Sequence, residues 1–560
     1  MNAIYRSLTV FLLTVVCQLA SAQDLDPTVV VDRAYEGKLI EVHKPSLEMA
    51  VPDTVMHFDL DFDYSVFESP YKGSYEFNPY LLSMKPSVSA DVAGKFYLRA
   101  GAGYQLRPEL DAIWSPVIKN KALSLDVYAR HRSYFGDCLA MKSSDDSYQR
   151  LSGMGFMDSK AGVNLGYELE NSVLKADVGY FGNHRLHSGK APRNYNAIDG
   201  ALSIGSRDKY ASDKTVYEAE IDFRLASDNG LAENNFKMGL AYGAPLKKAG
   251  SILVNLDVEQ DGYTGVLEGS AAMMSLAPHY VYSKGRLYAD LGLKLSKVAL
   301  DPSSDLFVYD AKEQVLFPDV NVRYQLVREA LMLFAKVGGG NKIYSNAYLI
   351  ERNRFFDIVG GGREILGLDY GADMGVGLER ISARAGLEGH FGPEFSWNLY
   401  AGYADHASGL VDAANPRAGV YGVAYVPYRT WNATAGWMWK TESILTEASL
   451  TYLNAWGDAF DGIDDYFKPA EFTGNISFEY NYSRRFFAGV DCEFSSERVC
   501  RDRAFTLPGY ADLGVSAEYV TSRSLSFWLR GGNLLGMTIH HNSLFAVKGP
   551  YFTLGICLKL

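Results

Sequence analysis

Charged side chains occupy every second position in several stretches of this chain. The clearest stretch is 217–225, where Glu218, Glu220, Asp222 and Arg224 alternate with apolar residues. Because successive side chains of an extended strand point to opposite faces, these four share one face. Acids and bases that line the lumen of a membrane barrel act on a solute through its charge. In a barrel such a face would line the lumen, where mixed charges usually form salt bridges and an excess of one sign favours solutes of the other.

The same alternation assigns further charges to the inward face of the predicted strands. They are Asp126, Arg130, Glu218, Glu220, Asp222, Arg224, Asp257, Glu259, Asp290, Lys294, Asp491 and Glu493. Among all the charges that we place on this face, acids outnumber bases by about two to one, which favours cations in an open pore. Alternatively, these charges form salt-bridge ladders that stiffen the barrel and fill its interior.

Other clusters were weighed as metal or catalytic sites. Segment 458–465 holds four aspartates, but their spacing does not fit a D-x-[DN]-x-[DN]-G loop, so we favour a solvated acidic loop. His184 and His187 lie in one predicted loop and His540 and His541 in another, without a supporting Cys or carboxylate pattern. The sequence has no G-x-S-x-G, H-E-x-x-H or P-loop motif. We therefore predict that the protein is not an enzyme and holds no cofactor or metal.

Long alternating strands are the elements that would position these charges. Stretches such as 287–295 and 486–494 match the roughly 9 to 11 residues of a tilted membrane strand, whereas strands of soluble sandwiches average about five or six. In 551–560 every second residue is apolar, as a closing strand in lipid requires, and we expect it to pair with the strand near Phe58. The 38 Tyr, 29 Phe and 53 Gly also suit a barrel with aromatic girdles. The predicted fold is an all-β transmembrane antiparallel β-barrel of about 22 strands, without a plug domain.

Turn signals fall into a short and a long class, as the two rims of such a barrel require. The long loops are expected to include 135–158, 340–365 and 405–417. The loop 340–365 carries Tyr344, Tyr348 and Phe356, and it could fold inward as a constriction or outward as a contact surface. The sequence leaves these two alternatives open.

Processing and location follow from the N-terminal residues. We predict a signal peptide over 1–22, an extended periplasmic arm over 23–53 and the barrel over 54–560. The expected location is the outer membrane of a Gram-negative cell, with its lipid as one partner. The net charge of −12 argues against nucleic acid as a partner. Cys492 and Cys500 could form a disulfide, but we favour unpaired thiols.

Both ends of the chain resemble the barrels of TonB-dependent receptors. Residues 26–31, which include Thr28, Val29, Val30 and Val31, resemble the TonB box, and 532–535 followed by 549–555 resembles the last hairpin of these receptors. The chain departs from the family in two respects, because strand alternation begins where a plug domain would follow the box and because Leu560 stands where an aromatic residue is usual. The resemblance implies an outer-membrane barrel, and contact with TonB stays open.

Two functions are compatible with these observations. In the first, a TonB-dependent-receptor-like, porin-like barrel passes or takes up a small to medium solute across the outer membrane. In the second, a structural or accessory barrel serves as a subunit or scaffold that binds a lipoprotein or another outer-membrane protein. Conductance separates them, because only the first predicts ion flow.

Overall fold

The structure of the protein is a computed structural model that describes the chain from Phe96 to Leu560 with gaps. The described residues are 96–118, 120, 122–141, 148–186, 193–207, 214–246, 250–301, 307–308, 315–328, 330–352, 356, 374–415, 420–457, 460, 466–500, 505–541 and 545–560. The segments predicted as signal peptide and arm, including Thr28 to Val31, lie outside this part of the chain, as do the four aspartates of 458–465 and His187.

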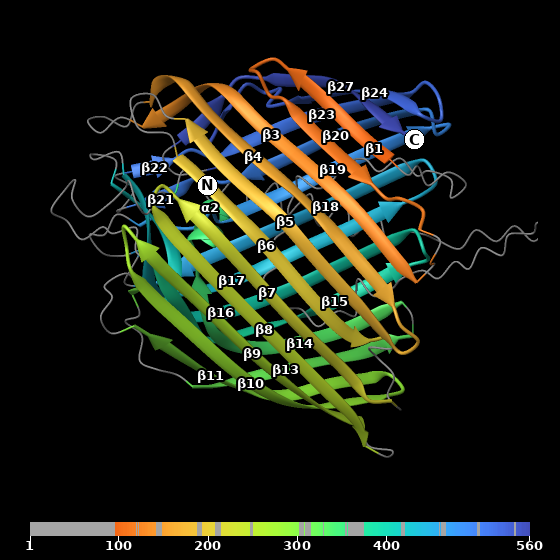
Figure 1. The fold of residues 1–560 in the computed structure, drawn as a ribbon, viewed down its shortest axis with the longest axis vertical. Coiled ribbons are helices and arrows are strands. Elements are labelled where there is room, and N and C mark those ends of the chain that lie inside the picture. The colour runs from red at the N-terminus through yellow and green to blue at the C-terminus, as the bar shows by residue number, and fades with distance from the viewer. Residues whose placement is uncertain are drawn as a thin grey trace, which may run out of the picture. The chain divides into compact units, whose positions relative to one another are not determined.

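A closed antiparallel barrel of 22 strands forms the described region (Figure 1). In chain order the wall strands are β1 (Phe96–Gly103), β2 (Glu109–Trp114), β3 (Leu123–Met141), β4 (Tyr148–Glu168), β5 (Ser172–Leu186), β6 (Arg193–Ser206), β7 (Val216–Asp228), β8 (Leu231–Leu246), β9 (Gly250–Gly265), β10 (Gly269–Lys284), β11 (Leu287–Leu300), β13 (Leu316–Val327), β14 (Leu331–Tyr344), β15 (Met374–Phe391), β16 (Phe395–Asn415), β17 (Val420–Lys440), β18 (Ile444–Trp456), β19 (Phe472–Tyr482), β20 (Phe486–Ser495), β23 (Tyr510–Val520), β24 (Leu525–Gly532) and β27 (Tyr551–Lys559).

Short elements lie in the long loops at one rim, which we call the loop end. They are β12 (Phe307–Val308), α2 (Asn346–Arg352), β21 (Arg498–Cys500), β22 (Phe505–Leu507), β25 (Thr538–Ile539) and β26 (Phe545–Lys548). The predicted all-β class and the predicted strand number are confirmed.

The barrel closes between its last and first wall strands. β27 pairs with β1 from Tyr97 opposite Lys559 to Gly103 opposite Thr553, and its other edge pairs with β24. The prediction that the last strand pairs with the strand near Phe58 is therefore wrong. Both edges of β27 are occupied, so no hydrogen-bonding edge is left for a segment near residue 58.

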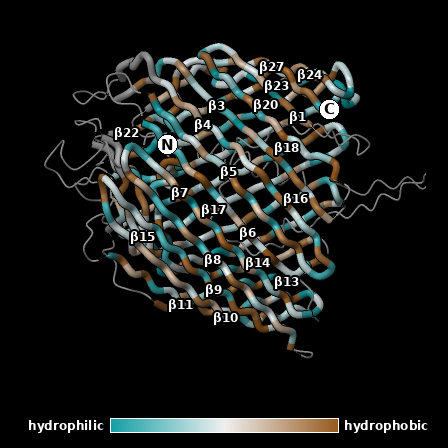
Figure 2. Tube along the Cα trace, viewed as in Figure 1, coloured by the Kyte–Doolittle hydropathy of each residue, from teal (hydrophilic) through white to brown (hydrophobic). Residues whose placement is uncertain are grey.

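Apolar side chains cover the outer face of the wall. In β7, Tyr217, Ile221, Phe223 and Leu225 are 37–52% exposed and alternate with the charged residues. Figure 2 shows the same alternation along neighbouring strands. This pattern suits a wall whose outside meets lipid and whose inside meets water. Among the described residues, no helix is both long and apolar enough to cross a bilayer.

Several strands are longer than a membrane requires. β3 has 19 residues and β16 has 21, whereas a tilted strand crosses the hydrocarbon with roughly 9 to 11. The predicted long loops at 135–158 and 405–417 are thus mostly strand, because β3 runs to Met141 and β16 to Asn415. Beyond the lipid a strand keeps its hydrogen-bond ladder but no longer needs an apolar face. The loss of alternation there therefore does not mark the end of the strand.

Short strands distinguish the closure region from the rest of the wall. β2 has 6 residues and pairs with β3 only as far as Arg132. Further along β3, the free edge is taken by β26, whose Ala546 pairs with Leu139. A segment of the last loop thereby completes the wall at the loop end.

A tryptophan packs on two opposed glycines where the barrel closes. Gly101 of β1 pairs with Gly555 of β27, and Trp528 of β24 lies against both and is 3% exposed. A Cβ atom placed on Gly101 would come within 2.4 Å of Trp528 Cζ2 and 2.8 Å of the Leu554 carbonyl oxygen. The Arg99 guanidinium covers the indole at 4.2 Å from a ring centroid. Both positions therefore require glycine, because the indole and the neighbouring backbone lie too close for a side chain.

Gly101→Val should destabilise the barrel by roughly 1–3 kcal/mol, because its side chain must displace the buried indole or part β1 from β27. The change is measured as the temperature at which the protein shifts from the folded to the unfolded band on a gel run without boiling. Ala100→Val is the matched control, since Ala100 pairs with Ile556, which is 40% exposed on the outer face. Equal unfolding temperatures for the two variants would contradict the packing argument.

Candidate functional site

A short helix, α2, lies in the loop between β14 and β15. It contains seven residues, of which Asn346, Ala347, Leu349 and Ile350 are buried. Ser345 caps its first turn, because the Tyr348 N–H donates to Ser345 Oγ at 3.2 Å. Ala, Leu, Glu and Arg in the segment favour a helix once it is capped. The described residues of the 340–365 loop therefore fold inward, which decides between the two predicted alternatives.

The N-terminal turn of α2 is bound by buried polar side chains of β8 and β9. The Ala347 N–H donates to Glu233 Oε1 at 3.3 Å, and the Asn346 N–H donates to the Tyr263 hydroxyl oxygen at 3.0 Å. The Tyr195 hydroxyl donates to Glu233 Oε2 at 3.2 Å. Glu233 is 1% exposed and Tyr263 2% exposed. A carboxylate buried this deeply is tolerated only with such partners. The backbone N–H groups of α2 and the polar side chains of the inner wall therefore supply each other's hydrogen bonds.

A buried ion pair supports the same turn. Arg193 at the start of β6 and Asp228 at the end of β7 are 1% and 2% exposed and form a bidentate pair, with Arg193 Nε donating to Asp228 Oδ1 at 2.9 Å. Asn346 Nδ2 donates to Asp228 Oδ2 at 3.1 Å. The guanidinium thus neutralises the carboxylate that holds Asn346.

The C-terminal end of α2 reaches two sectors of the wall. Arg352 Nη2 lies 2.8 Å from Asp412 Oδ1 on β16, while Glu351 Oε1 lies 3.7 Å from Arg224 Nη2 on β7 and 4.0 Å from Lys160 Nζ on β4. β16 is several wall strands away from β4 to β9 in the sheet order. In Figure 1, α2 lies behind β6 and β7 and in front of β16 and β17. The helix therefore spans part of the lumen at the loop end.

An apolar cluster fills the space around α2. Leu349 and Ile350 are 1% exposed, and Phe356 and Met374 are fully buried. The wall contributes Phe181, Tyr195, Ala197, Ala226, Leu231, Tyr263, Ala271, Leu410 and Val423 to the same cluster. Inward positions that would otherwise face water are therefore covered at this rim, and α2 with its cluster is the candidate constriction of the lumen.

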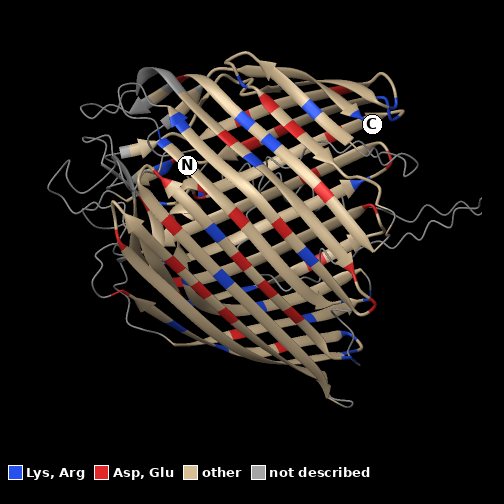
Figure 3. Cartoon of the chain, in the orientation of Figure 1, with Lys and Arg blue, Asp and Glu red and all other residues tan. Residues whose placement is uncertain are grey.

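The predicted inward charges of β7, β9, β11 and β20 alternate with the exposed apolar side chains of their strands, and Figure 3 shows where charged residues lie along the wall. Five of them have described polar partners: Asp126 with Ser115, Arg224 with Asp199, Glu259 with Lys237, Asp290 with His279 and Glu493 with Tyr510. The others, Arg130, Glu218, Glu220, Asp222, Asp257, Lys294 and Asp491, occupy the same alternation. Two of these contacts, Arg224 with Asp199 and Glu259 with Lys237, are salt bridges between neighbouring strands.

Among the predicted histidines, His184, His540 and His541 are described and His187 is not. His184 Nδ1 lies 3.0 Å from Asn194 Oδ1, and the described part of the chain contains no group of three His, Cys, Asp or Glu side chains that could hold a metal ion. His540 is 1% exposed, and its carbonyl accepts from Arg498, whereas His541 lies beside Tyr510. Cys492 is a free thiol.

Acid should loosen the loop that holds His540. Burial, followed by the positive charges of Arg498 and His541, lowers the pKa of His540 to about 4. Its ordinary pKa is about 6.5, so its contribution to stability is complete above that pH and is lost as the pH falls from about 6.5 to 4, by at most roughly 3 kcal/mol. Hydrogen exchange of the amides in 538–548 measures this loss. His540→Gln should remove the pH dependence, and an unchanged profile in that variant would contradict the assignment.

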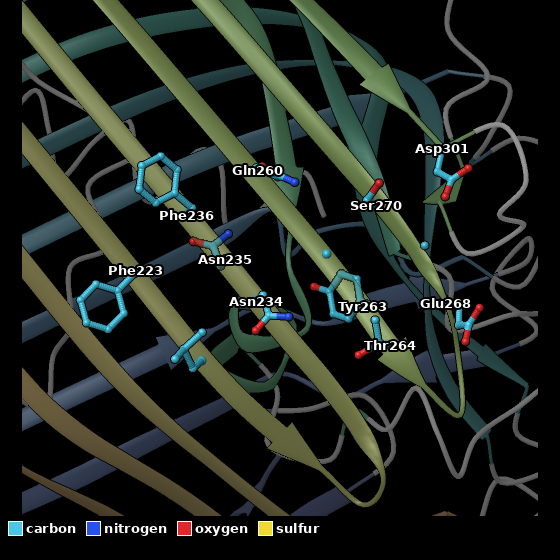
Figure 4. A pocket seen from close by; sticks show the side chains of 13 residues that line it. Phe223, Asn234, Asn235, Phe236, Gln260, Tyr263, Thr264, Glu268, Ser270 and Asp301 are labelled. Atoms are coloured by element: carbon cyan, nitrogen blue, oxygen red, sulfur yellow. The ribbon is translucent and has the colours of Figure 1, made fainter.

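A separate hollow of about 590 Å³ lies on β7 to β10 near their loop end (Figure 4). Phe223, Leu225 and Phe236 line one part of it, and amides and hydroxyls including Asn234, Gln260 and Thr264 line another. The three apolar side chains are 40–52% exposed and belong to the outer face. The hollow is thus distinct from the α2 contacts, although Tyr263 borders both.

Comparison with known proteins defines the class of the fold. No protein-family model matches the chain, and no curated protein matches its sequence. Solved structures do match, and they are transport receptors rather than enzymes. The fold is that of the TonB-dependent siderophore and copper receptors.

Three of these structures illustrate the likeness. A mutant of the ferric enterobactin receptor PfeA from Pseudomonas aeruginosa has a TM-score of 0.59 and 10% sequence identity, and the match covers 83% of this chain and 80% of that one. The copper transporter OprC gives 0.59, 12%, 83% and 80% for the same quantities. The siderophore receptor PirA from Acinetobacter baumannii gives 0.58, 11%, 83% and 80%. At these identities the likeness concerns the fold.

Proposed function

We propose that the protein is an outer-membrane barrel through which a small to medium solute is taken up, and that α2 sets the width of the passage at the loop end. The observation that carries the proposal is the fixation of α2 between β4, β7, β8 and β9 on one side and β16 on the other. A ring of 22 strands encloses a wide lumen. An inserted helix restricts such a lumen without filling its whole length.

The inward charges would make the passage selective. Asp126, Glu218, Glu220, Asp222, Asp257, Glu259, Asp290, Asp491 and Glu493 outnumber Arg130, Arg224 and Lys294 in the proposed set. Fixed negative charge raises the local concentration of cations and lowers that of anions. The proposed barrel therefore prefers cations or uncharged solutes.

The N-terminal residues would place the barrel in its membrane. We infer a signal peptide over 1–22, a periplasmic arm over 23–53 and a barrel region over 54–560 that has no plug domain. The solved relatives are receptors, which supports an outer-membrane setting. The arm with Thr28, Val29, Val30 and Val31 is the segment through which TonB would act, if it acts on this barrel.

An accessory barrel is the second candidate function. The apolar cluster around α2 supports it, because a barrel closed at its loop end would serve as a scaffold for a lipoprotein or another outer-membrane protein. Recovery of a stoichiometric partner from mild detergent is the result that this candidate predicts.

Planar bilayers test the first function. Single barrels should give discrete current steps, and a KCl gradient should give a reversal potential of the sign for cation preference. Asp222→Asn with Glu220→Gln should move the reversal potential toward zero. The control Glu168→Gln, at the end of β4, where the side chain is 59% exposed and pairs with Arg207, should move it much less. If neither the wild type nor a variant lacking α2 gave any current, transport would be rejected in favour of the accessory role.

A further inference from the structure

The inner wall has two sectors of different chemistry. On β4 to β9 the inward positions carry ion pairs such as Arg224 with Asp199 and Lys237 with Glu259, and α2 binds this sector. On β16 to β19 a set of inward positions carries amides and hydroxyls instead. We call this set the amide–hydroxyl wall: Asn398, Asn432, Thr434, Ser449, Thr451 and Asn475.

Strand register places these side chains together. Asn398 pairs with Gly436, Gly436 with Ser449, and Ser449 with Asn475, so one row crosses four adjacent strands. Thr434 and Thr451 form the next row, and their hydroxyl oxygens are 3.1 Å apart. The intervening positions point outward.

The exposed apolar residues confirm which face of these strands is inward. Leu399 is 50% exposed, Trp431 40% and Ile476 40%, and each alternates with members of the amide–hydroxyl wall. Because alternate side chains take opposite faces, the amides and hydroxyls face the lumen.

The three asparagines keep hydrogen-bonding capacity for a solute. A Cβ atom on Gly436 would lie 2.8 Å from Asn398 Oδ1, and one on Gly402 would lie 2.4 Å from Asn432 Oδ1, so these amides lie over glycines. Within the described residues, the side-chain amides of Asn398, Asn432 and Asn475 have no hydrogen-bond partner in the protein. Each amide offers two donors and one acceptor oxygen.

We propose that the amide–hydroxyl wall binds an uncharged, polyhydroxylated solute of the saccharide class. This inference rests on the proposed uptake function and names its substrate class. A sugar hydroxyl both donates and accepts hydrogen bonds. Side-chain amides and hydroxyls also do both, whereas an ammonium group only donates and a carboxylate only accepts. No member of the wall is Lys or Arg. Glu493 pairs with Asn475, while Glu447 and Asp491 pair with Ser477 next to the wall, and these acids repel anionic solutes. A phosphate or carboxylate ligand finds a cation at the β15 edge of the wall, where Arg384 pairs with Gly402 and Gly402 with Asn432, but meets acids at the β20 edge.

Current block by trisaccharides tests the assignment. Maltotriose is uncharged, and maltotrionate has the same length with one carboxylate, so the two probes differ mainly in charge. Maltotriose added to single conducting barrels should interrupt the current at millimolar concentration, and maltotrionate should do so at least about tenfold more weakly. The triple variant Asn398→Leu, Asn432→Leu and Asn475→Leu should weaken the maltotriose block by about tenfold or more, since each lost hydrogen bond changes affinity severalfold.

The matched control is Asn164→Leu. Asn164 is an exposed inward asparagine on β4, paired with Asp126 in the charged sector, and its replacement should leave the block unchanged. Equal block by both trisaccharides, or equal loss in control and triple variant, would overturn the saccharide assignment while leaving uptake intact.

Direct binding separates failure of this inference from failure of the proposed function. Titration calorimetry of maltotriose into barrels purified in an amine-oxide detergent, which has no sugar headgroup, does not depend on conduction. Heat of binding that the triple variant loses would support the wall even if the barrel were electrically silent. If the wild type conducted ions but maltotriose gave neither heat of binding nor current block, the saccharide assignment would be rejected and the uptake function would stand.

Discussion

Arg193→Met should destabilise the loop end of the barrel by roughly 3–5 kcal/mol, the usual cost of breaking a buried ion pair from one side. Asp228, 2% exposed, would then keep its charge without the guanidinium, beside the Asn346 amide that it holds. The first turn of α2 should become exchangeable. Hydrogen exchange of the amides in 346–352 and denaturant unfolding in micelles measure the two effects.

Two controls separate the buried charge from the mere loss of an arginine. Arg207→Met removes the partner of Glu168 in an exposed ion pair, in which the Arg207 side chain is 53% exposed and the Glu168 side chain 59%. This variant should change stability by no more than about 1 kcal/mol. The double variant Arg193→Met with Asp228→Leu should recover most of the lost stability, because neither charge of the pair remains. If the double variant were as unstable as the single variant, the electrostatic explanation would be wrong.

Replacement of 346–352 by a glycine and serine linker of equal length should raise single-channel conductance severalfold. An α-helix with its side chains is about 10–12 Å wide, a large share of any lumen that it crosses. The linker cannot keep the hydrogen bonds to Glu233 and Tyr263. The linker also removes Leu349 and Ile350, which contribute to the apolar cluster at this rim.

A milder variant tests whether the helix, rather than loop composition, restricts the current. Glu351→Gln with Arg352→Gln keeps the helix and its buried first turn but removes the ion pairs to β7 and β16, which are partly exposed. We expect flickering between conductance levels with an unchanged closed level. Unaltered conductance after replacement of the whole of α2 would show that the passage is restricted elsewhere.

The wall of this barrel could be predicted from local patterns. The alternation in 217–225 requires only that one face meets lipid and the other water, and β7 obeys it. The number of strands followed from the average spacing of such stretches. Closure was assigned to the wrong strand because alternation around Phe58 looks the same as that of a wall strand, and the identity of the pairing partner depends on the whole ring.

The site could be predicted only in part. The 340–365 loop stood out by its aromatic residues, yet its direction depends on Arg193, Asp228 and Glu233, none of which local alternation distinguishes from solvated charges. Asn346 meets Asp228 only in the folded barrel, since they are 118 positions apart. Likewise, the loop-end part of β16 departs from the alternation of the wall, because Leu410 packs in the apolar cluster around α2, which only the folded barrel brings together.

The pairing of β26 with β3 joins two distant parts of the chain. Ala546 meets Leu139 across nearly the whole described chain, and the edge of β3 is available to it only where β2 has ended. Bringing such distant segments together costs more chain entropy than any neighbouring hairpin of the wall. The contact between β1 and β27 joins residues still farther apart, so forming either contact lowers the chain-entropy cost of the other, and protection of the Ala546 amide during refolding would report when this part of the ring is complete.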